Sequence, residues 1–208
     1  MPIPLIVAVA AAALAAAGLL GKSLVDAARG KQIVVLGPRM TGKSTLTDFL
    51  HTGQIRRQYI PTQARREFKC DVKLETVGLK LKIIDFSGDK SAWKDAREKA
   101  RNADQPLFLA SWRQLMDERP SSAAPHHSPK DLTRRAADQV GSWNPKNRPI
   151  LIITHADFAD AEVRGEIESH TTVRDLKRLL RADKVYAANL MDEAEISRLG
   201  ISILETFK

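Results

Sequence analysis

Short apolar runs alternate with charged or amphipathic stretches along most of the chain. Residues 33–36, 107–110 and 150–153 are almost wholly apolar, which predicts strands that are buried on both faces. The full predicted strands of this kind are 32–36, 106–112, 149–154 and 184–188. Periodicity and charge predict helices between and after them, at 45–51, 91–101, 131–143, 171–181 and 192–207.

A different pattern occupies residues 67–85, where apolar and charged residues alternate on both sides of Gly78. An alternation of period two is typical of strands with one buried face. Two such segments around a glycine predict a β-hairpin, with strands at 67–77 and 79–85 and its turn at Gly78.

Strands that alternate with helices predict an α/β fold, because a parallel strand pair needs a crossover connection and that connection is usually a helix. We expect a mainly parallel six-stranded sheet, with helices on both faces and the hairpin 67–85 as an antiparallel edge. Ligand-binding residues are then expected beyond the carboxyl ends of the strands. This domain is predicted to span residues 32–208, after a linker at 22–31.

The N-terminal segment has no charge between residues 3 and 20. As a helix, this run would be about 27 Å long, close to the roughly 30 Å hydrocarbon core of a bilayer. Lys22, Arg29 and Lys31 follow, and the positive-inside rule then keeps the rest of the chain in the cytoplasm. We predict a single transmembrane anchor at residues 1–21. A cleaved signal peptide and a soluble helix remain alternatives.

The composition, 43% hydrophobic and 28% charged, is that of a globular protein. A formal net charge of +8 favours an anionic partner, either nucleotide, nucleic acid or lipid. No aromatic run alternates with the basic residues, so no nucleic-acid partner is expected. The lone cysteine, Cys70, excludes an intramolecular disulfide, and His126 and His127 lie in a Ser- and Pro-rich loop at 117–130 without the spacing of a zinc site.

The strongest chemical signal is the segment GPRMTGKS at residues 37–44, which matches G-x-x-x-x-G-K-[ST] between a predicted strand and a predicted helix. Its glycines let backbone N–H groups converge on phosphate oxygens, and the helix N-terminus adds partial positive charge. Lys43 is expected to reach the β- and γ-phosphates, and Ser44 to ligate Mg²⁺. The nucleotide contacts predicted in this segment are Gly37, Arg39, Met40, Thr41, Gly42, Lys43, Ser44 and Thr45.

Two further segments can complete such a site. Asp85 ends an apolar strand and begins a D-x-x-G pattern, so its carboxylate can hold Mg²⁺ through water while Gly88 lets a backbone N–H approach the γ-phosphate. Thr62 follows Pro61 in a segment that can close over the nucleotide, with its hydroxyl on Mg²⁺. A plain turn at Pro61 is the alternative for that segment.

In this order, the three segments resemble the Ras-like small GTPases, including the Arf-like branch, over residues 32–208. The resemblance implies a P-loop NTPase fold, GTP/GDP and Mg²⁺ as cofactors, and two switch loops that bind a protein effector or regulator. It also implies a base-reading site at Thr154, His155, Asp157, Ala188 and Asn189. Asp157 can accept two hydrogen bonds from guanine, whereas adenine has no matching donors at those positions.

Three residues depart from the family pattern. His155 replaces the usual lysine, whose stem packs on the base, and Arg39 replaces a loop glycine. Asp89 stands where the family has a water-orienting glutamine, and an ionised carboxylate cannot donate a hydrogen bond. We therefore expect slow intrinsic hydrolysis, with Lys43, Thr62 and Asp89 at the catalytic centre.

The leading hypothesis is thus a membrane-anchored GTP/GDP switch with its GTPase domain on the cytoplasmic side. An N-terminal anchor before a small GTPase domain is a plan similar to that of the signal recognition particle receptor β subunits. A pseudo-GTPase that holds nucleotide without turnover is the first alternative, and a P-loop ATPase is the second.

Overall fold

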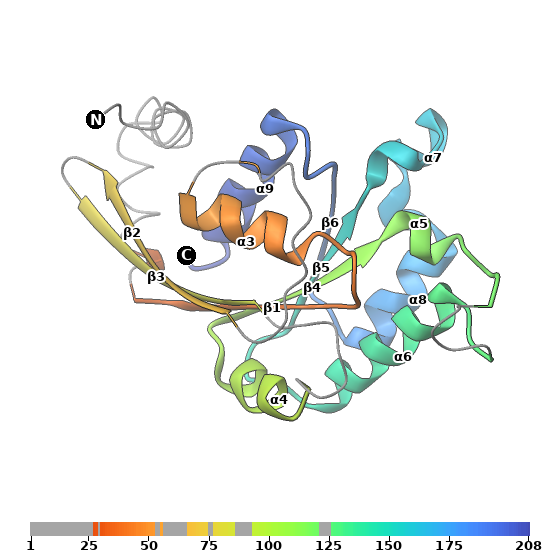
Figure 1. The fold of residues 1–208 in the computed structure, drawn as a ribbon, viewed down its shortest axis with the longest axis horizontal. Coiled ribbons are helices and arrows are strands. Elements are labelled where there is room, and N and C mark those ends of the chain that lie inside the picture. The colour runs from red at the N-terminus through yellow and green to blue at the C-terminus, as the bar shows by residue number, and fades with distance from the viewer. Residues whose placement is uncertain are drawn as a thin grey trace.

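A computed structural model describes residues 27–28, 30–52, 55, 66–74, 77–85, 93–120 and 126–208. Six strands form one sheet in the order β2-β3-β1-β4-β5-β6 (Figure 1). They are β1 (Gln32–Leu36), β2 (Arg66–Leu74), β3 (Val77–Asp85), β4 (Gln105–Ser111), β5 (Ile150–Thr154) and β6 (Lys184–Ala188). Parallel pairing joins β3, β1, β4, β5 and β6 in turn, and β2 pairs antiparallel with β3. The predicted α/β class, with a parallel sheet and helices, is confirmed.

One face of the sheet is covered by α3 (Lys43–Thr52) and α9 (Glu193–Glu205), which lie above it in Figure 1. Alternate residues of the central strands, such as Ile33 and Val35 of β1, pack there against Leu46 of α3 and Ile196 of α9. Every residue of β4 and β5 is buried, as expected for strands covered on both sides.

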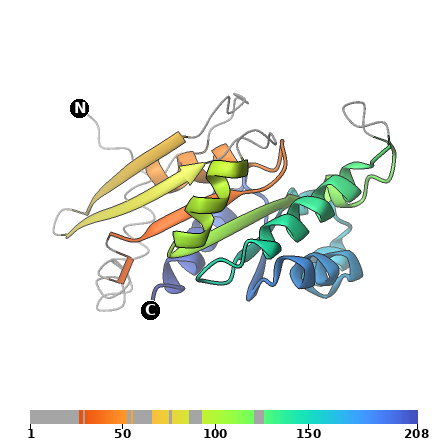
Figure 2. The same cartoon turned by 90° about the horizontal axis from the view of Figure 1, so that it is seen from below.

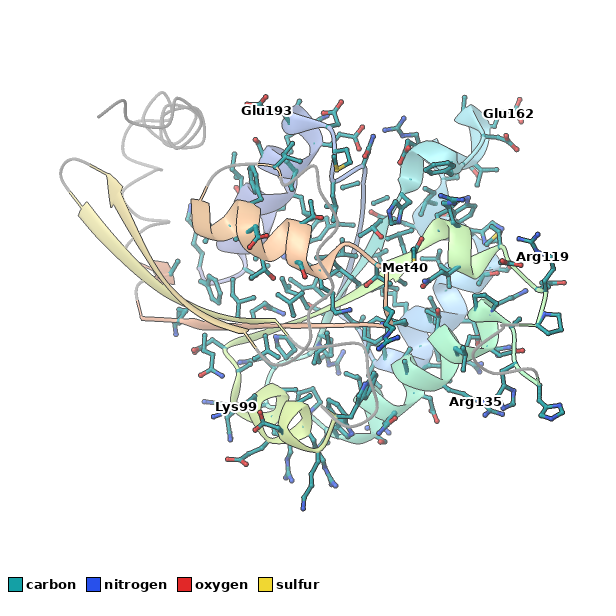
Figure 3. All side chains as sticks on the ribbon, in the orientation of Figure 1. Met40, Lys99, Arg119, Arg135, Glu162 and Glu193 are labelled. Atoms are coloured by element: carbon teal, nitrogen blue, oxygen red, sulfur yellow. The ribbon has the colours of Figure 1, made fainter. Side chains whose placement is uncertain are left out.

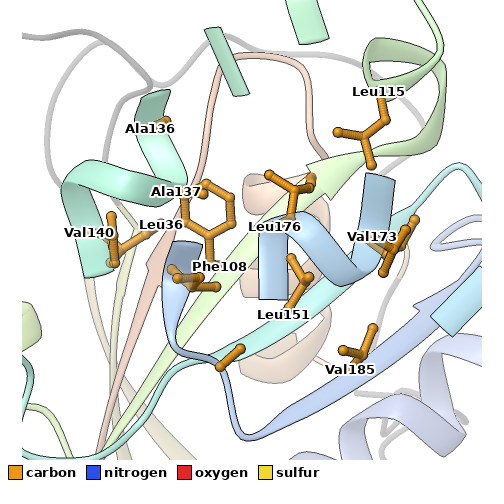
Figure 4. Close-up of a cluster of buried hydrophobic side chains, with 14 of the residues drawn as sticks. Leu36, Phe108, Leu115, Ala136, Ala137, Val140, Leu151, Val173, Leu176 and Val185 are labelled. Atoms are coloured by element: carbon orange, nitrogen blue, oxygen red, sulfur yellow. The ribbon is translucent and has the colours of Figure 1, made fainter. Parts of the chain in front are cut away.

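The opposite face is covered by α4 (Trp93–Asn102), α6 (Pro129–Ser142) and α8 (Thr171–Leu180), as Figures 1 and 2 show. Phe108 and Leu151 of the sheet pack here among Val140 and Leu176 (Figure 4). The two helices α6 and α8 come very close at Gly141, where a Cβ atom would lie 2.1 Å from the backbone oxygen of Leu179.

The hairpin turn is not at Gly78, so that part of the prediction was wrong. Leu74 pairs with Val77, and Gly78 lies inside β3 opposite Lys73. The observed register pairs Phe68 with Ile83, Cys70 with Leu81 and Val72 with Leu79, so these apolar residues of β2 lie opposite apolar residues of β3. Pairs of this kind are expected to stabilise one register of a hairpin.

Four short helices of the described residues were not predicted. Trp112, which was expected to end a strand, begins α5 (Trp112–Leu115) instead. The 3-10 helices η2 (Ala156–Phe158) and η3 (Ile167–Ser169) and the helix α7 (Ala161–Gly165) lie between β5 and α8. The expected loop at 117–130 ends earlier than predicted, because a capping box between Ser128 and Asp131 starts α6 at Pro129.

The predicted anchor at 1–21 lies outside the described residues, as does most of the linker at 22–31. Within the part of the chain that the structure describes, none of the helices has the length and apolar character needed to cross a membrane.

Candidate functional site

The loops predicted to bind a ligand leave the sheet at its carboxyl edge. The connection from β1 goes to α3 on one face, whereas the connections from β3 and β4 go to α4 and α5 and thus to the other face. Strands of an open α/β sheet whose connections diverge in this way leave a crevice beyond their ends, which is the usual place of ligand binding. The segment at 37–44, here called the phosphate loop, begins in this crevice.

The phosphate loop has the backbone conformation that its glycines allow. Gly37 and Gly42 have φ angles of 138° and 81°, values that L side chains rarely adopt. A Cβ atom on Gly37 would lie 2.2 Å from the backbone oxygen of Leu109, so the loop starts in close contact with β4. Met40 also has a positive φ, 60°, and its side chain is 67% exposed, between α3 and α5 in Figure 3.

Lys43 folds back over the loop that precedes it. Its Nζ donates a 2.6 Å hydrogen bond to the backbone oxygen of Pro38, and the Thr41 hydroxyl donates to the same oxygen at 3.0 Å. The Lys43 side chain is only 6% exposed, so its charge is held within the loop. Lys43, Ser44 and Thr45 form the first turn of α3, and the N-terminus of a helix favours an anion.

The loop after β5, at residues 154–157 and here called the base loop, is tied directly to the phosphate loop. The buried hydroxyl of Thr154 donates a 3.0 Å hydrogen bond to the backbone oxygen of Thr41. The two segments are 113 residues apart in the chain, yet one hydrogen bond fixes their spacing. Thr154 therefore sets the distance between the predicted phosphate and base sites.

His155 has a left-handed backbone, with φ 54° and ψ 37°. Its Nδ1 lies 2.9 Å from the hydroxyl oxygen of Ser111, at the carboxyl end of β4, and 3.3 Å from that of Thr154. Burial lowers the pKa of the imidazole; the Asp157 carboxylate opposes this shift and the Arg113 guanidinium adds to it. The ring is therefore neutral near pH 7.

Asp157 lies in η2 and is exposed at the carboxyl edge. Ala188 ends β6 beside Thr154, its register partner in β5, so the third predicted loop meets the base loop. The neighbouring Asn189 donates its backbone N–H to the Glu195 carboxylate at 2.8 Å. Glu195 also pairs with Arg164 of α7, and this pair connects the segment after the base loop to α9.

Gly42 shows how closely the three loops pack together. A Cβ atom at this position would lie 2.7 Å from Leu190, in the loop after β6, and 4.0 Å from the Thr154 side chain. Of the predicted nucleotide contacts, the phosphate loop, the base loop and the residues 188–189 are thus brought together at one edge of the sheet.

The remaining predicted residues are those expected around Mg²⁺ and the γ-phosphate. Thr62, Gly88 and Asp89 lie outside the described residues. The backbone of Asp85 ends β3 beside Val35 of β1, next to the start of the phosphate loop. A magnesium ion would be held there by Ser44, by water and by phosphate oxygens, which is how Mg²⁺ is usually bound beside nucleotides. Such a site needs no protein cage, and the described residues contain no cluster of three or more His, Cys, Asp or Glu.

Two residues that were not predicted support the site from β4 and α5. Ser111 holds the His155 ring, and Gln114 donates a 2.8 Å hydrogen bond to the backbone oxygen of Arg39 in the phosphate loop. A cavity of about 1070 Å³ lies over α5 and borders both loops, at Met40 and His155. The sequence feature that could have indicated Ser111 is its position as a polar residue at the carboxyl end of a buried strand. No sequence feature indicated Gln114.

Comparison with protein-family models found no matching family, and comparison with curated proteins found no matching relative.

Proposed function

We propose that this chain binds GTP and GDP with Mg²⁺ and acts as a nucleotide-dependent switch with slow intrinsic hydrolysis. The observation that carries the proposal is the meeting of the phosphate loop, the base loop and residues 188–189 at the switch point of the sheet. A nucleoside triphosphate needs a cationic cradle at one end and a base-reading group at the other. The P-loop NTPase fold belongs to the same proposal.

In this proposal Lys43 leaves the Pro38 oxygen and turns to the β- and γ-phosphates, which offer charged acceptors in place of a neutral carbonyl. The backbone N–H groups of the loop and of the first turn of α3 hold the other phosphate oxygens. Ser44 and, through water, Asp85 hold Mg²⁺, and Thr62 and Gly88 respond to the γ-phosphate.

Guanine preference is assigned to Asp157, whose carboxylate would accept hydrogen bonds from N1 and N2 of the base. Its exposure at the carboxyl edge, three residues after Thr154, is consistent with this role. The ring of His155 is held by Ser111 and is neutral, so it would contact the nucleotide as a flat surface rather than as a cation.

A pseudo-GTPase is the second candidate, and a specific observation favours it. The backbone N–H of Asn189, one of the residues expected at the base-reading site, is already engaged by Glu195. Together with Asp89 in place of a water-orienting glutamine, this favours a protein that holds nucleotide more than it turns it over.

Membrane attachment through residues 1–21 and an effector that binds the switch segments are further parts of the proposal. The apolar run at 3–20 supports the first part. Extraction of the full chain from membranes by alkaline carbonate tests it, since an integral anchor resists this treatment and a peripheral protein is released.

The test of nucleotide binding is a competition titration. Fluorescent GDP is bound to the full chain in neutral detergent and displaced by GTP, GDP or ATP, first with Mg²⁺ and then with EDTA. We expect GTP and GDP to compete at least tenfold better than ATP, and EDTA to weaken binding. Equal competition by ATP would point to a P-loop ATPase, and the absence of binding would reject the proposal. Turnover of bound GTP, measured as phosphate release, separates the switch from the pseudo-GTPase.

A further inference from the structure

The amino edge of the sheet, opposite the proposed nucleotide site, has a second cavity of very different chemistry. Its volume is about 760 Å³, and it lies where the segments before β5 and β6 meet α8. One carboxylate, Glu168, lines it. The cations that line it are Arg148, Arg174, Lys177, Arg178 and Arg181.

Most of these cations have no carboxylate partner among the residues that the structure describes. Arg178 pairs with Asp175 at 2.7 Å. The other four form no ion pair within the described part of the chain. The C-terminal dipole of α8 offsets about half a charge, which is much less than the charge gathered here. Like charges around one cavity repel, and an anionic ligand would remove that repulsion.

The cavity lies on the same edge at which the chain enters the sheet, and hydrogen bonds join the two places. The backbone N–H of Gln32 donates to the Asp104 carboxylate at 2.9 Å, and Lys31 pairs with it. Asn147 donates to the backbone oxygen of Asp104 at 2.9 Å, and the next residue, Arg148, lines the cavity.

The apolar run at 3–20 ends shortly before this edge. Ten residues lie between Leu20 and Lys31, and the eleven steps from one residue to the next span at most about 38 Å when fully extended. If the run is in a bilayer, the amino edge stays within that distance of the lipid headgroups. The tether then gives the cavity a high local concentration of headgroups, so a weak affinity is sufficient for docking.

We propose that this basic cavity binds the phosphate-bearing headgroup of an anionic phospholipid and thereby docks the domain on the membrane by its amino edge. The carboxyl edge, with the nucleotide loops, then faces away from the membrane and is open to partners. The lipid as the source of the phosphate rests on the proposed anchor, whereas the affinity of the basic cavity for an anion does not. The cavity is lined by no aromatic side chain, so a base-stacking nucleic acid fits it less well.

The experiment uses the full chain in lipid nanodiscs with a trace of dansyl-labelled phosphatidylethanolamine. Energy transfer from the tryptophans to dansyl reports how close the domain lies to the bilayer. We expect more transfer in discs that contain phosphatidylserine than in discs of phosphatidylcholine alone. A cation near an anionic membrane contributes about 1 kcal/mol, or about fivefold in an equilibrium constant.

The test variant combines Arg148→Gln, Arg174→Gln and Lys177→Gln, which are all exposed positions. It should shift the docking equilibrium by about a hundredfold and lose the response to phosphatidylserine. A control variant removes the same charge elsewhere through Arg119→Gln, Arg135→Gln and Arg198→Gln, and should keep the response. Equal responses of the two variants would overturn the proposal, because the effect would then be one of net charge alone.

A second arm titrates inositol hexakisphosphate, a soluble polyphosphate, into the same proteins by calorimetry. If the wild type binds this probe and the Arg148, Arg174 and Lys177 substitutions weaken the binding, the cavity is supported as an anion site. This holds even if the chain fails to insert into discs, in which case only the proposed anchor fails. Tight binding of the soluble probe with no response to phosphatidylserine would overturn the lipid as the ligand. Absence of both effects would overturn the cavity as a phosphate site.

Discussion

The phosphate loop and the base loop lie at the same edge of the sheet and touch through one hydrogen bond, yet they are held in different ways. The phosphate loop is shaped mainly by its own residues, through two glycines of positive φ and the two hydrogen bonds to the Pro38 oxygen. The base loop is held mainly by distant residues, through Ser111 on β4 and the Thr41 oxygen.

This difference indicates how each loop will respond to change. In the phosphate loop, which is shaped by its own glycines, adding a single atom at one of those glycines should be enough to disrupt the loop. The base loop, which is held by several distant residues, can lose one of these contacts and still form. The effect of such a loss on stability and affinity should be smaller. Substitutions in the two loops should therefore differ in size as well as in kind.

Gly37→Ala should have the largest effect. The added Cβ would lie 2.2 Å from a backbone oxygen of β4, at a φ of 138° that alanine rarely adopts. We expect the free energy of unfolding to fall by about 3 kcal/mol and nucleotide binding to be lost. Urea unfolding and a titration with fluorescent GDP measure the two effects.

The control is Gly165→Ala in α7, where an added Cβ has no atom within 4 Å. This variant should be unchanged or up to about 1 kcal/mol more stable, since alanine favours a helix over glycine. If Gly37→Ala behaves like Gly165→Ala, the phosphate loop is not held against β4.

Lys43→Met should come next, and it should separate binding from folding. The buried stem is kept while the charge that the loop holds is removed. We expect affinity for GDP to fall by about a hundredfold, with the free energy of unfolding changed by less than about 1 kcal/mol. Lys184→Met, at an exposed position in β6, is the matched control and should bind as the wild type does.

Thr154→Val tests the link between the loops. The substitution keeps the shape but leaves the Thr41 oxygen without this donor, which should cost about 1–2 kcal/mol of stability and lower affinity for GDP about fivefold. Thr133→Val in α6 is the control, because it also removes a buried hydroxyl, here one that donates to Pro129 at 2.8 Å. It should lower stability similarly and leave affinity unchanged; a parallel loss of affinity in both would refute a specific link.

The smallest effect should be the pH dependence that His155 contributes. Its folded pKa is lowered, so the folded protein binds the proton less well than the unfolded chain does. The contribution of His155 to the free energy of unfolding is therefore fully present above the pKa of the unfolded chain, about 6.5. It is lost as the pH falls through the pKa of His155 in the folded protein. Because the ring is half-buried, we expect this contribution to the free energy of unfolding to be less than about 1 kcal/mol.

The free energy of unfolding measured at pH 8 and pH 5 checks this expectation against His155→Asn. Asparagine tolerates the left-handed backbone of this position and does not titrate. The wild type should lose more stability than the variant at the lower pH. An equal loss would mean that other groups account for the pH dependence.

The same contrast explains how much of the site could be predicted. The strands 32–36 and 150–154 and the phosphate loop follow from residues that are neighbours in the chain, because periodicity and glycine conformation are local properties. The contacts of Ser111 with His155 and of Gln114 with Arg39 join residues 44 and 75 positions apart. No local pattern encodes such contacts, and only the folded sheet brings them together.

The errors in the fold have similar causes. A glycine between two alternating segments predicts a turn at Gly78, but the register depends on which residues oppose one another along both strands. Trp112 continues an apolar run, which predicts a strand, yet it is the first residue of α5 and its side chain is buried there. The short helices between β5 and α8 contain too few residues to show a period.

The close approach of α6 and α8 at Gly141 has a consequence for how this sequence can vary in evolution. The atom that a side chain at 141 would meet is a backbone oxygen, so no exchange at position 179 can make room for it. Gly141 should therefore stay invariant in every lineage that keeps these helices at their present separation, even though glycine weakens the helix in which it stands. Any lineage that has lost it should show compensating change along the whole length of both helices rather than at one partner position.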